Sequence, residues 1–135
     1  MGKGFIIDPK IKREVGRIGE CLLGSGEIDI EWNHIRDVLL QDRKTIIAFG
    51  SGTGRNRATK ACKDALSRYR YAAGTTIRPR RLVFRAVGPG NLLLKEVNDA
   101  REMVEGSLCP ASQAVFGVAR DYGLKDEVRI TILAA

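Results

Sequence analysis

The fold is decided by residues 44–66, which read KTIIAFGSGTGRNRATKACKDAL. Residues 44–50 form an apolar, β-branched run that ends in glycine, which is typical of a strand buried in a sheet. Residues 50–54 then supply a glycine-rich turn, and Asn56 is a candidate N-cap for a helix. That helix is indicated by an apolar stripe made of Ala58, Ala61, Cys62, Ala65 and Leu66. The stretch therefore predicts a strand, a glycine turn and a helix, in that order.

The residues that follow continue the same alternation. Residues 81–87 read as another strand, and residues 93–104 carry a third amphipathic stripe. Residues 113–119 and 127–133 predict two further strands, which we expect to pair as neighbours. The chain is thus predicted to be an α/β protein, an α+β two-layer sandwich in which two helices cover one face of a four-stranded mixed sheet.

The residues that precede this unit predict two helices joined by an extended loop. A long N-terminal helix over residues 9–24 is indicated by apolar side chains at Ile11, Val15, Ile18 and Leu22. Residues 27–31 alternate acidic and apolar side chains, and a short helix follows from Trp32. We divide the chain into a segment of residues 1–40 and a domain of residues 41–135.

Composition excludes several classes of protein. With 135 residues, 44% of them hydrophobic and 29% charged, the chain is long and apolar enough to form one globular domain, which excludes a disordered or fibrous protein. Its apolar runs fall far short of the ~20 residues of a membrane-spanning helix. The N-terminal apolar stretch is too short for a signal peptide, so we expect a cytoplasmic protein.

The sequence gives little support for a metal site or for a catalytic triad. Cys21, Cys62 and Cys109 lie far apart in the sequence, without the close pairs of a zinc or thioredoxin-like site, and we expect buried thiols. The single histidine, His34, excludes a His-rich metal site and leaves a catalytic triad one possible base. We predict no metal site.

The formal net charge of +7 is concentrated in one stretch. Residues 55–85 hold ten basic residues and one acid, Asp64. Such a stretch is consistent with a solvated surface, with an acidic protein partner or with nucleic acid. Arginine suits bidentate contacts to carboxylate or phosphate, and the candidate anion or partner contacts are Arg55, Arg57, Arg78, Arg80 and Arg81.

Two motifs could carry chemistry. The glycine turn could cradle phosphate, but it lacks the Walker A ending and is explained as well by a chain reversal. Glu27, Asp29 and Glu31 alternate just before a helix that carries His34. These carboxylates could cap the helix, or a carboxylate or imidazole there could orient or deprotonate water.

The chain resembles the C-terminal half of FtsZ, the bacterial tubulin homologue, over almost its whole length. The matching segments, in order, are GEIDIEWNHIRDV at 26–38, AFGSGTGRNRA at 48–58, GNLLLKEV at 90–97, AVFGVA at 114–119 and DEVRITILA at 126–134. In that family the acidic loop follows a central helix, here residues 9–24, and reaches into the nucleotide site of the next subunit in a filament. The resemblance also implies that the glycine turn joins a strand to a helix and does not bind nucleotide.

The resemblance implies a site that acts in trans. Glu31 and His34 stand where the family has catalytic-loop aspartates, and Asp29 replaces its usual asparagine, so these three are the candidate catalytic residues. The family's GTP-binding half is not found in this sequence. We therefore expect that the chain alone binds no cofactor, that GTP with Mg²⁺ belongs to a parent protein or a neighbouring subunit, and that the partner is an FtsZ-like nucleotide-binding domain or further copies in a filament.

Two other functions stay open. A non-catalytic basic module could hold an acidic protein or nucleic acid, and its binding would then weaken steeply with salt. A small α/β-sandwich enzyme could bind a dicarboxylate through arginines, as chorismate mutases do. The basic stretch of residues 55–85 differs from the acidic balance typical of FtsZ and favours a divergent paralogue over the division protein itself.

Overall fold

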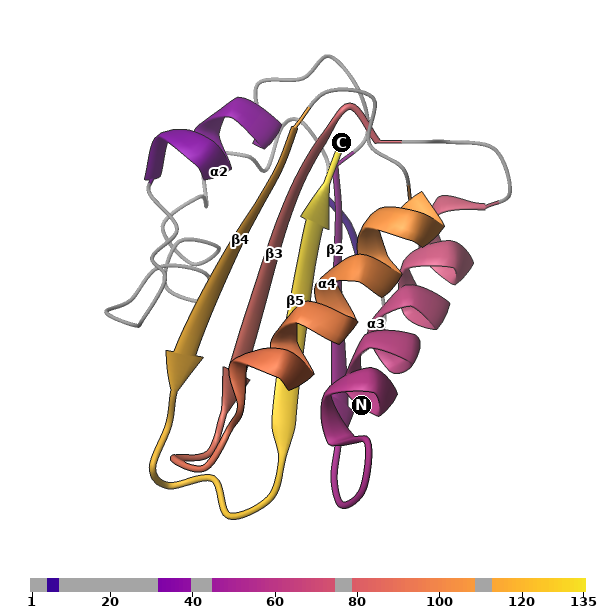
Figure 1. Cartoon of the computed structure of the whole chain (residues 1–135). Helices are drawn as coiled ribbons and strands as arrows, with labels where there is room; N and C mark the ends of the chain where they lie inside the picture. The colour runs from indigo at the N-terminus through magenta and orange to yellow at the C-terminus, as the bar shows by residue number, and fades with distance from the viewer. Residues whose placement is uncertain (1–4, 8–31, 40–44, 75–78, 109–112) are drawn as a thin grey trace.

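The computed structural model describes residues 5–7, 32–39, 45–74, 79–108 and 113–135 (Figure 1). The predicted helix at 9–24 and the acidic loop lie outside these ranges. The elements are β1 (Phe5–Ile7), α2 (Trp32–Leu39), β2 (Thr45–Gly52), α3 (Arg57–Ala73), β3 (Arg81–Gly88), α4 (Leu94–Leu108), β4 (Gln113–Arg120) and β5 (Val128–Ala134). The four strands and three helices predicted over these ranges are confirmed, and β1 is an additional, three-residue strand.

The strands form one mixed sheet in the order β1-β2-β5-β3-β4. β3 and β4 are parallel, and β5 is antiparallel to both β2 and β3. The expectation that the last two strands pair as neighbours was wrong, because β5 inserts between β2 and β3. Burial explains this place: Leu133 and Ala134 are both fully buried, so β5 is covered on both faces near its end. The residues between β4 and β5 cross the end of β3 instead of forming a tight hairpin.

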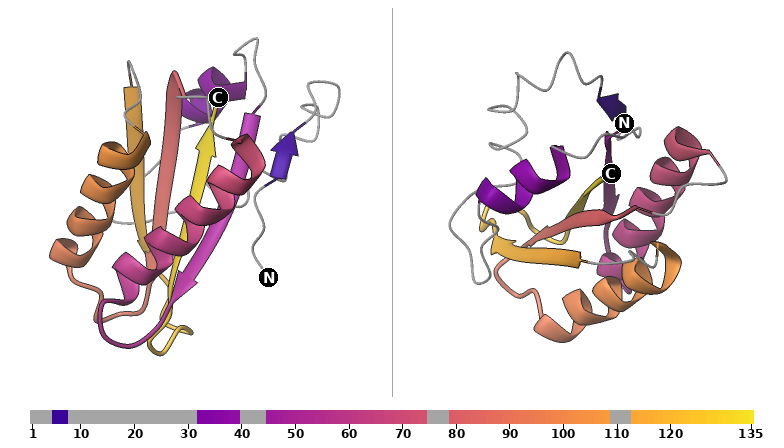
Figure 2. Two further views of the ribbon diagram at one scale, coloured as in Figure 1. Left: turned by 90° about the vertical axis from the view of Figure 1, so that its right-hand side faces the viewer. Right: turned by 90° about the horizontal axis from the view of Figure 1, so that it is seen from above.

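The two faces of the sheet are covered differently (Figure 2). α3 and α4 lie side by side on one face, as predicted, and form the main core with it; the core side chains include Ala61, Ala65, Phe84, Val104 and Ile132. α2 lies on the opposite face. There its Ile35 and Val38 pack on Ile47, Val83 and Leu133 at the end of the sheet where β2 and β3 begin.

Two glycines of β2 set the distance between β2 and α3. A Cβ added to Gly50 would collide with the carbonyl oxygen of Ala61 and the backbone nitrogen of Ala65. A Cβ on Gly52 would collide with the carbonyl oxygen of Arg57. The glycine turn predicted from the sequence is thus also a contact surface, since a strand and a helix meet backbone to backbone there.

Two predictions concern α3: that Asn56 is its N-cap and that Cys62 is buried. Asn56 occupies the N-cap position, but it adopts a left-handed conformation with φ 59° and its side chain makes no cap hydrogen bond. Cys62 is buried as predicted, and its Sγ lies 3.4 Å from the carbonyl oxygen of Ala100. Burial raises the pKa of the Cys62 thiol to about 12. Cys21 and Cys109 lie outside the described residues.

We expect Gly50→Ala to lower the free energy of unfolding by about 2–3 kcal/mol, because the added methyl would push α3 away from β2. Gly106→Ala in α4 is the matched control, since nothing lies within 4 Å of a Cβ at that position. The control should gain about 0.5 kcal/mol from the lower entropy of the unfolded chain. Urea unfolding of both variants tests the contrast, and equal effects would show that the close approach is not limiting.

Candidate functional site

α2 packs at one end of the sheet and contains His34, the last of the three predicted catalytic residues. Ile35 and Val38 are fully buried in its contact with the sheet. His34, the residue before Ile35, is half-buried and is engaged in an interaction within the chain. His34 is therefore not a side chain that projects freely into solvent.

The other two predicted catalytic residues, Asp29 and Glu31, lie outside the described residues. Glu31 directly precedes the first residue of α2.

At the opposite end of the sheet, the buried guanidinium of Arg57 joins three segments. Its Nε and Nη2 donate to the two carboxylate oxygens of Glu96, at 3.0 and 3.2 Å. Its Nη1 donates to Asp126 at 3.2 Å, and Nη2 also donates to the carbonyl oxygen of Asn91 at 3.3 Å. The side chain is only 8% exposed. We call Arg57, Glu96 and Asp126 the arginine clamp, because they tie α3 to α4 and to the segment before β5.

Each carboxylate of the arginine clamp also accepts a backbone hydrogen bond. The Leu93 amide donates to Glu96 at 2.8 Å, which satisfies a free N–H at the start of α4 in the manner of a capping box. The Gly54 amide donates to Asp126 at 2.6 Å. The glycine turn thus meets a carboxylate of its own chain at Gly54, where a phosphate would otherwise have to bind.

The clamp favours the ionised forms of Arg57 and Glu96. The pKa of Arg57 is raised, first by its hydrogen bond to Glu96, with further contributions from Asp126 that together outweigh burial. Burial alone would raise the pKa of Glu96, but the hydrogen bonds from Arg57 and from the Leu93 amide outweigh it and the pKa is lowered. Arg57 and Glu96 therefore form a charged pair that is held by hydrogen bonds within the chain.

The predicted arginine contacts do not form one surface. Arg55 is exposed at the clamp end of the sheet, whereas Arg57 is buried there. Arg80 and Arg81 lie at the other end, where their amides donate to the carbonyl oxygen of Ala135 at 2.7 and 3.0 Å. β3, with eight residues, separates the two ends by about 26 Å. The fifth candidate, Arg78, lies outside the described residues.

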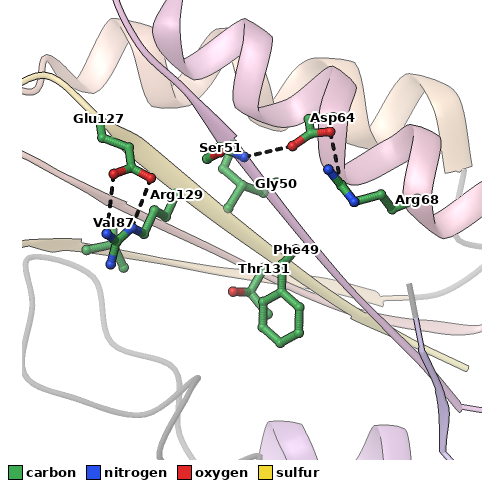
Figure 3. Close-up of a pocket in the computed structure, with 10 residues that line it drawn as sticks. Phe49, Gly50, Ser51, Asp64, Arg68, Val87, Glu127, Arg129 and Thr131 are labelled. Carbon is green, nitrogen blue, oxygen red and sulfur yellow. Dashed lines mark hydrogen bonds and ion pairs between the residues drawn. The ribbon is translucent and has the colours of Figure 1, made fainter. Parts of the chain in front are cut away.

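A groove of about 390 Å³ runs along β2 and β5 (Figure 3). Its charged side chains are paired with one another. Asp64 accepts hydrogen bonds from the Ser51 amide at 3.1 Å and from Arg68 at 3.0 Å, and Arg129 pairs with Glu127 at 3.1 Å. A dicarboxylate would therefore have to displace a carboxylate of the chain from either arginine, so the groove gives the dicarboxylate-enzyme hypothesis no support.

The described residues show neither a metal-binding cluster nor a helix that could span a membrane. Within the described ranges, no three His, Cys, Asp or Glu side chains gather closely enough to hold a metal ion. No helix in those ranges has the length and apolar character needed to cross a bilayer.

Sequence reasoning missed Glu96 and Asp126 as partners of Arg57. A signal for Glu96 was present, because it stands three residues after Leu93 at the start of an apolar helical stripe, where a glutamate can close a capping box. No local pattern links Asp126 to Arg57, since the two come together only when β5 joins the sheet.

We expect Arg57→Ala to lower the free energy of unfolding by about 3 kcal/mol, because it leaves Glu96 and Asp126 without their shared cation. Arg55→Ala removes the same side chain two residues earlier, where it is exposed, and should change stability by less than about 0.5 kcal/mol. Chemical denaturation of the two variants measures the difference. Similar losses would mean that the clamp contributes nothing specific.

The clamp also predicts a dependence of stability on pH. A carboxyl group with a lowered folded-state pKa stabilises the fold above its ordinary value of 4.5 and loses that contribution as pH falls through the folded-state value. We expect Glu96→Gln to cost about 1.5–3 kcal/mol at neutral pH, with the deficit shrinking progressively below about pH 4.5. Denaturant midpoints measured from pH 7 to pH 3 test this, and a deficit independent of pH would refute it.

The comparisons with known proteins agree with this architecture. Residues 44–135 match the family model described as FtsZ family, C-terminal domain. The cell division protein FtsZ of Caulobacter vibrioides is 23% identical over 127 residues, which make up 94% of this chain and 25% of that protein. The chain thus spans about a quarter of the length of that curated relative.

Solved structures share the fold at low sequence identity. The empty FtsZ dimer of M. jannaschii gives a TM-score of 0.72 at 21% identity and covers 92% of this chain and 36% of that one. CetZ2 from Haloferax volcanii, solved as a GTPγS-bound protofilament, gives 0.57 at 16% identity and covers 92% and 38%. Since the family model covers more than half of the sequence, this chain belongs to the FtsZ family and carries its C-terminal domain.

Proposed function

We propose that this chain is a polymer-contact domain that completes the GTPase site of a neighbouring FtsZ-type subunit. Residues 26–34 would meet GTP and Mg²⁺ held by that neighbour. The observation that carries the proposal is the anchoring of α2, because Ile35 and Val38 fix it to one end of the sheet and Glu31 directly precedes α2 in the sequence. A contact in a filament needs its reactive segment at one end of the subunit.

The proposed chemistry belongs chiefly to Glu31. Its carboxylate would orient the water that attacks the terminal phosphate, or accept a proton from that water. Asp29, two residues earlier in the sequence, would add a second carboxylate. His34 would adjust the position of this segment or accept a proton, because a neutral imidazole cannot replace a carboxylate's charge beside a cation.

Two relatives support assembly through such a contact. One is described as an FtsZ dimer and the other as a protofilament with bound GTPγS. Both cover more than nine tenths of this chain, so the part of each relative that matches includes the C-terminal domain. The partner that we propose is therefore a further copy of the chain in a filament or a separate nucleotide-binding domain.

The alternative is a basic module for an acidic protein or nucleic acid. It has less support, because Arg55 lies at one end of the sheet and Arg80 and Arg81 lie at the other. Arg57 is buried and already paired within the clamp. The predicted arginines therefore do not form one compact patch for a polyanion.

The test adds this chain to a GTP-loaded nucleotide-binding half of an FtsZ relative and measures phosphate release. We expect the chain to stimulate hydrolysis, and Glu31→Gln to reduce the stimulation at least about 100-fold without loss of binding. Glu102→Gln, the same exchange on exposed α4, should leave the stimulation intact. Undiminished stimulation by Glu31→Gln would refute the catalytic assignment.

A further inference from the structure

The outward face of α3 carries a basic stripe. Lys60, Lys63 and Arg70 are exposed at helical spacings that put them on one side of α3. Lys63 and Arg70 form no ion pair with any residue that the structure describes, and the Lys60 ammonium donates to the backbone oxygen of Thr53 at 3.2 Å. The acid of α3, Asp64, is paired with Arg68 beside the groove. We call Lys60, Lys63 and Arg70 the basic stripe.

The outward face of α4 carries the opposite charge. Asp99 and Glu102 are exposed, and Glu105, with its side chain 44% exposed, continues the row. Two basic residues of α4 lie close to this row in sequence. Lys95 is exposed one turn before Asp99, and Arg101 stacks on the ring of Phe116 at 4.8 Å and approaches Glu105 only to 4.0 Å. We call Asp99, Glu102 and Glu105 the acidic stripe.

The two stripes lie side by side on one surface. α3 and α4 are neighbours on the same face of the sheet (Figures 1 and 2). They run in the same direction, because each returns from one of two parallel strands, β2 and β3, that are both antiparallel to β5. Among the described residues, no ion pair joins the basic stripe to the acidic stripe.

The surface formed by the two stripes is complementary in charge to a second copy of itself. A two-fold axis that runs parallel to the helices and midway between them turns a second copy so that its α4 faces α3, and its α3 faces α4. Each basic stripe then meets an acidic stripe, and the contact occurs twice in one closed interface. A two-fold axis across the helices would instead set like charges against each other.

We propose that the helical layer forms a face-to-face homodimer in which the basic stripe of each copy contacts the acidic stripe of the other. A polyanion fits this surface poorly, since it would have to cover the acidic stripe as well as the basic one. An acidic protein meets the same obstacle. A second copy carries both charges at the required separation.

Contacts of this kind are weak and sensitive to salt. The charges are exposed, so each pair contributes little and is screened by ions. We expect the dimer in sedimentation equilibrium at high protein concentration and about 0.01 M salt, with dissociation as salt approaches about 1 M, where the screening length falls to about 3 Å.

The decisive test is a charge swap. One variant carries Lys63→Glu and Arg70→Glu, and the other carries Asp99→Lys and Glu102→Lys. Each variant alone should be monomeric, since both of its stripes then have the same sign. An equal mixture of the two should form a heterodimer, because the facing stripes then again carry net charges of opposite sign. The control, Arg36→Glu with Lys125→Glu, reverses two exposed charges away from the helical layer and should dimerise like the unchanged chain.

Other results would overturn the proposal. A monomer at all salt concentrations would do so, as would a dimer that survives both double variants, or a mixture that fails to associate. A chain that stays monomeric but is retained on heparin through Lys63 and Arg70 would identify a polyanion as the partner instead. Glu31→Gln should dimerise normally, so loss of the proposed GTPase contact leaves this interface testable by itself.

Discussion

The backbone contact between β2 and α3 is the constraint on which the rest of the structure depends. Gly50 and Gly52 have no Cβ, so the helix approaches the strand until its carbonyl oxygens fill the space where side chains would be. This approach fixes the first turn of α3, because the carbonyl oxygen of Arg57 lies against Gly52. The guanidinium of Arg57 is then in reach of both Glu96 and Asp126. One steric fact thereby positions the three segments that close one end of the sheet.

The two faces of the sheet are suited to different tasks. The α2 face buries Ile35 and Val38 at the end where the predicted catalytic segment is attached. The other face is covered by α3 and α4, whose outward sides carry the basic stripe and the acidic stripe. The arginine clamp lies at the far end of the sheet from α2. A contact at the α2 end and a contact through the helical layer would therefore not compete for the same residues.

Local patterns predicted the elements well and their pairing less well. The strand at 45–52 and the helix after it followed from an apolar run, glycines and an alanine-rich stripe, all of which act over short distances. The place of β5 was missed because a strand between two others and a strand beside one neighbour show the same alternation until burial on both faces is known. For the candidate site, the sequence-based prediction treated the arginines of residues 55–81 as one group of contacts. It could not show that Arg57 is buried and that β3 separates Arg55 from Arg80 and Arg81, because those facts depend on tertiary contacts.

The central position of β5 has a consequence for synthesis on the ribosome. β2 and β3 are not hydrogen-bonded to each other, and both pair with β5, which is translated after them. Ile132 of β5, for example, lies opposite both Ala48 and Phe84. Until Val128–Ala134 leaves the exit tunnel, the nascent chain exposes two apolar strand edges, which are sites for aggregation or for chaperone binding. Such long-range pairing also implies a high contact order and slow folding. The helices can form early, but the sheet is completed only when its middle strand arrives.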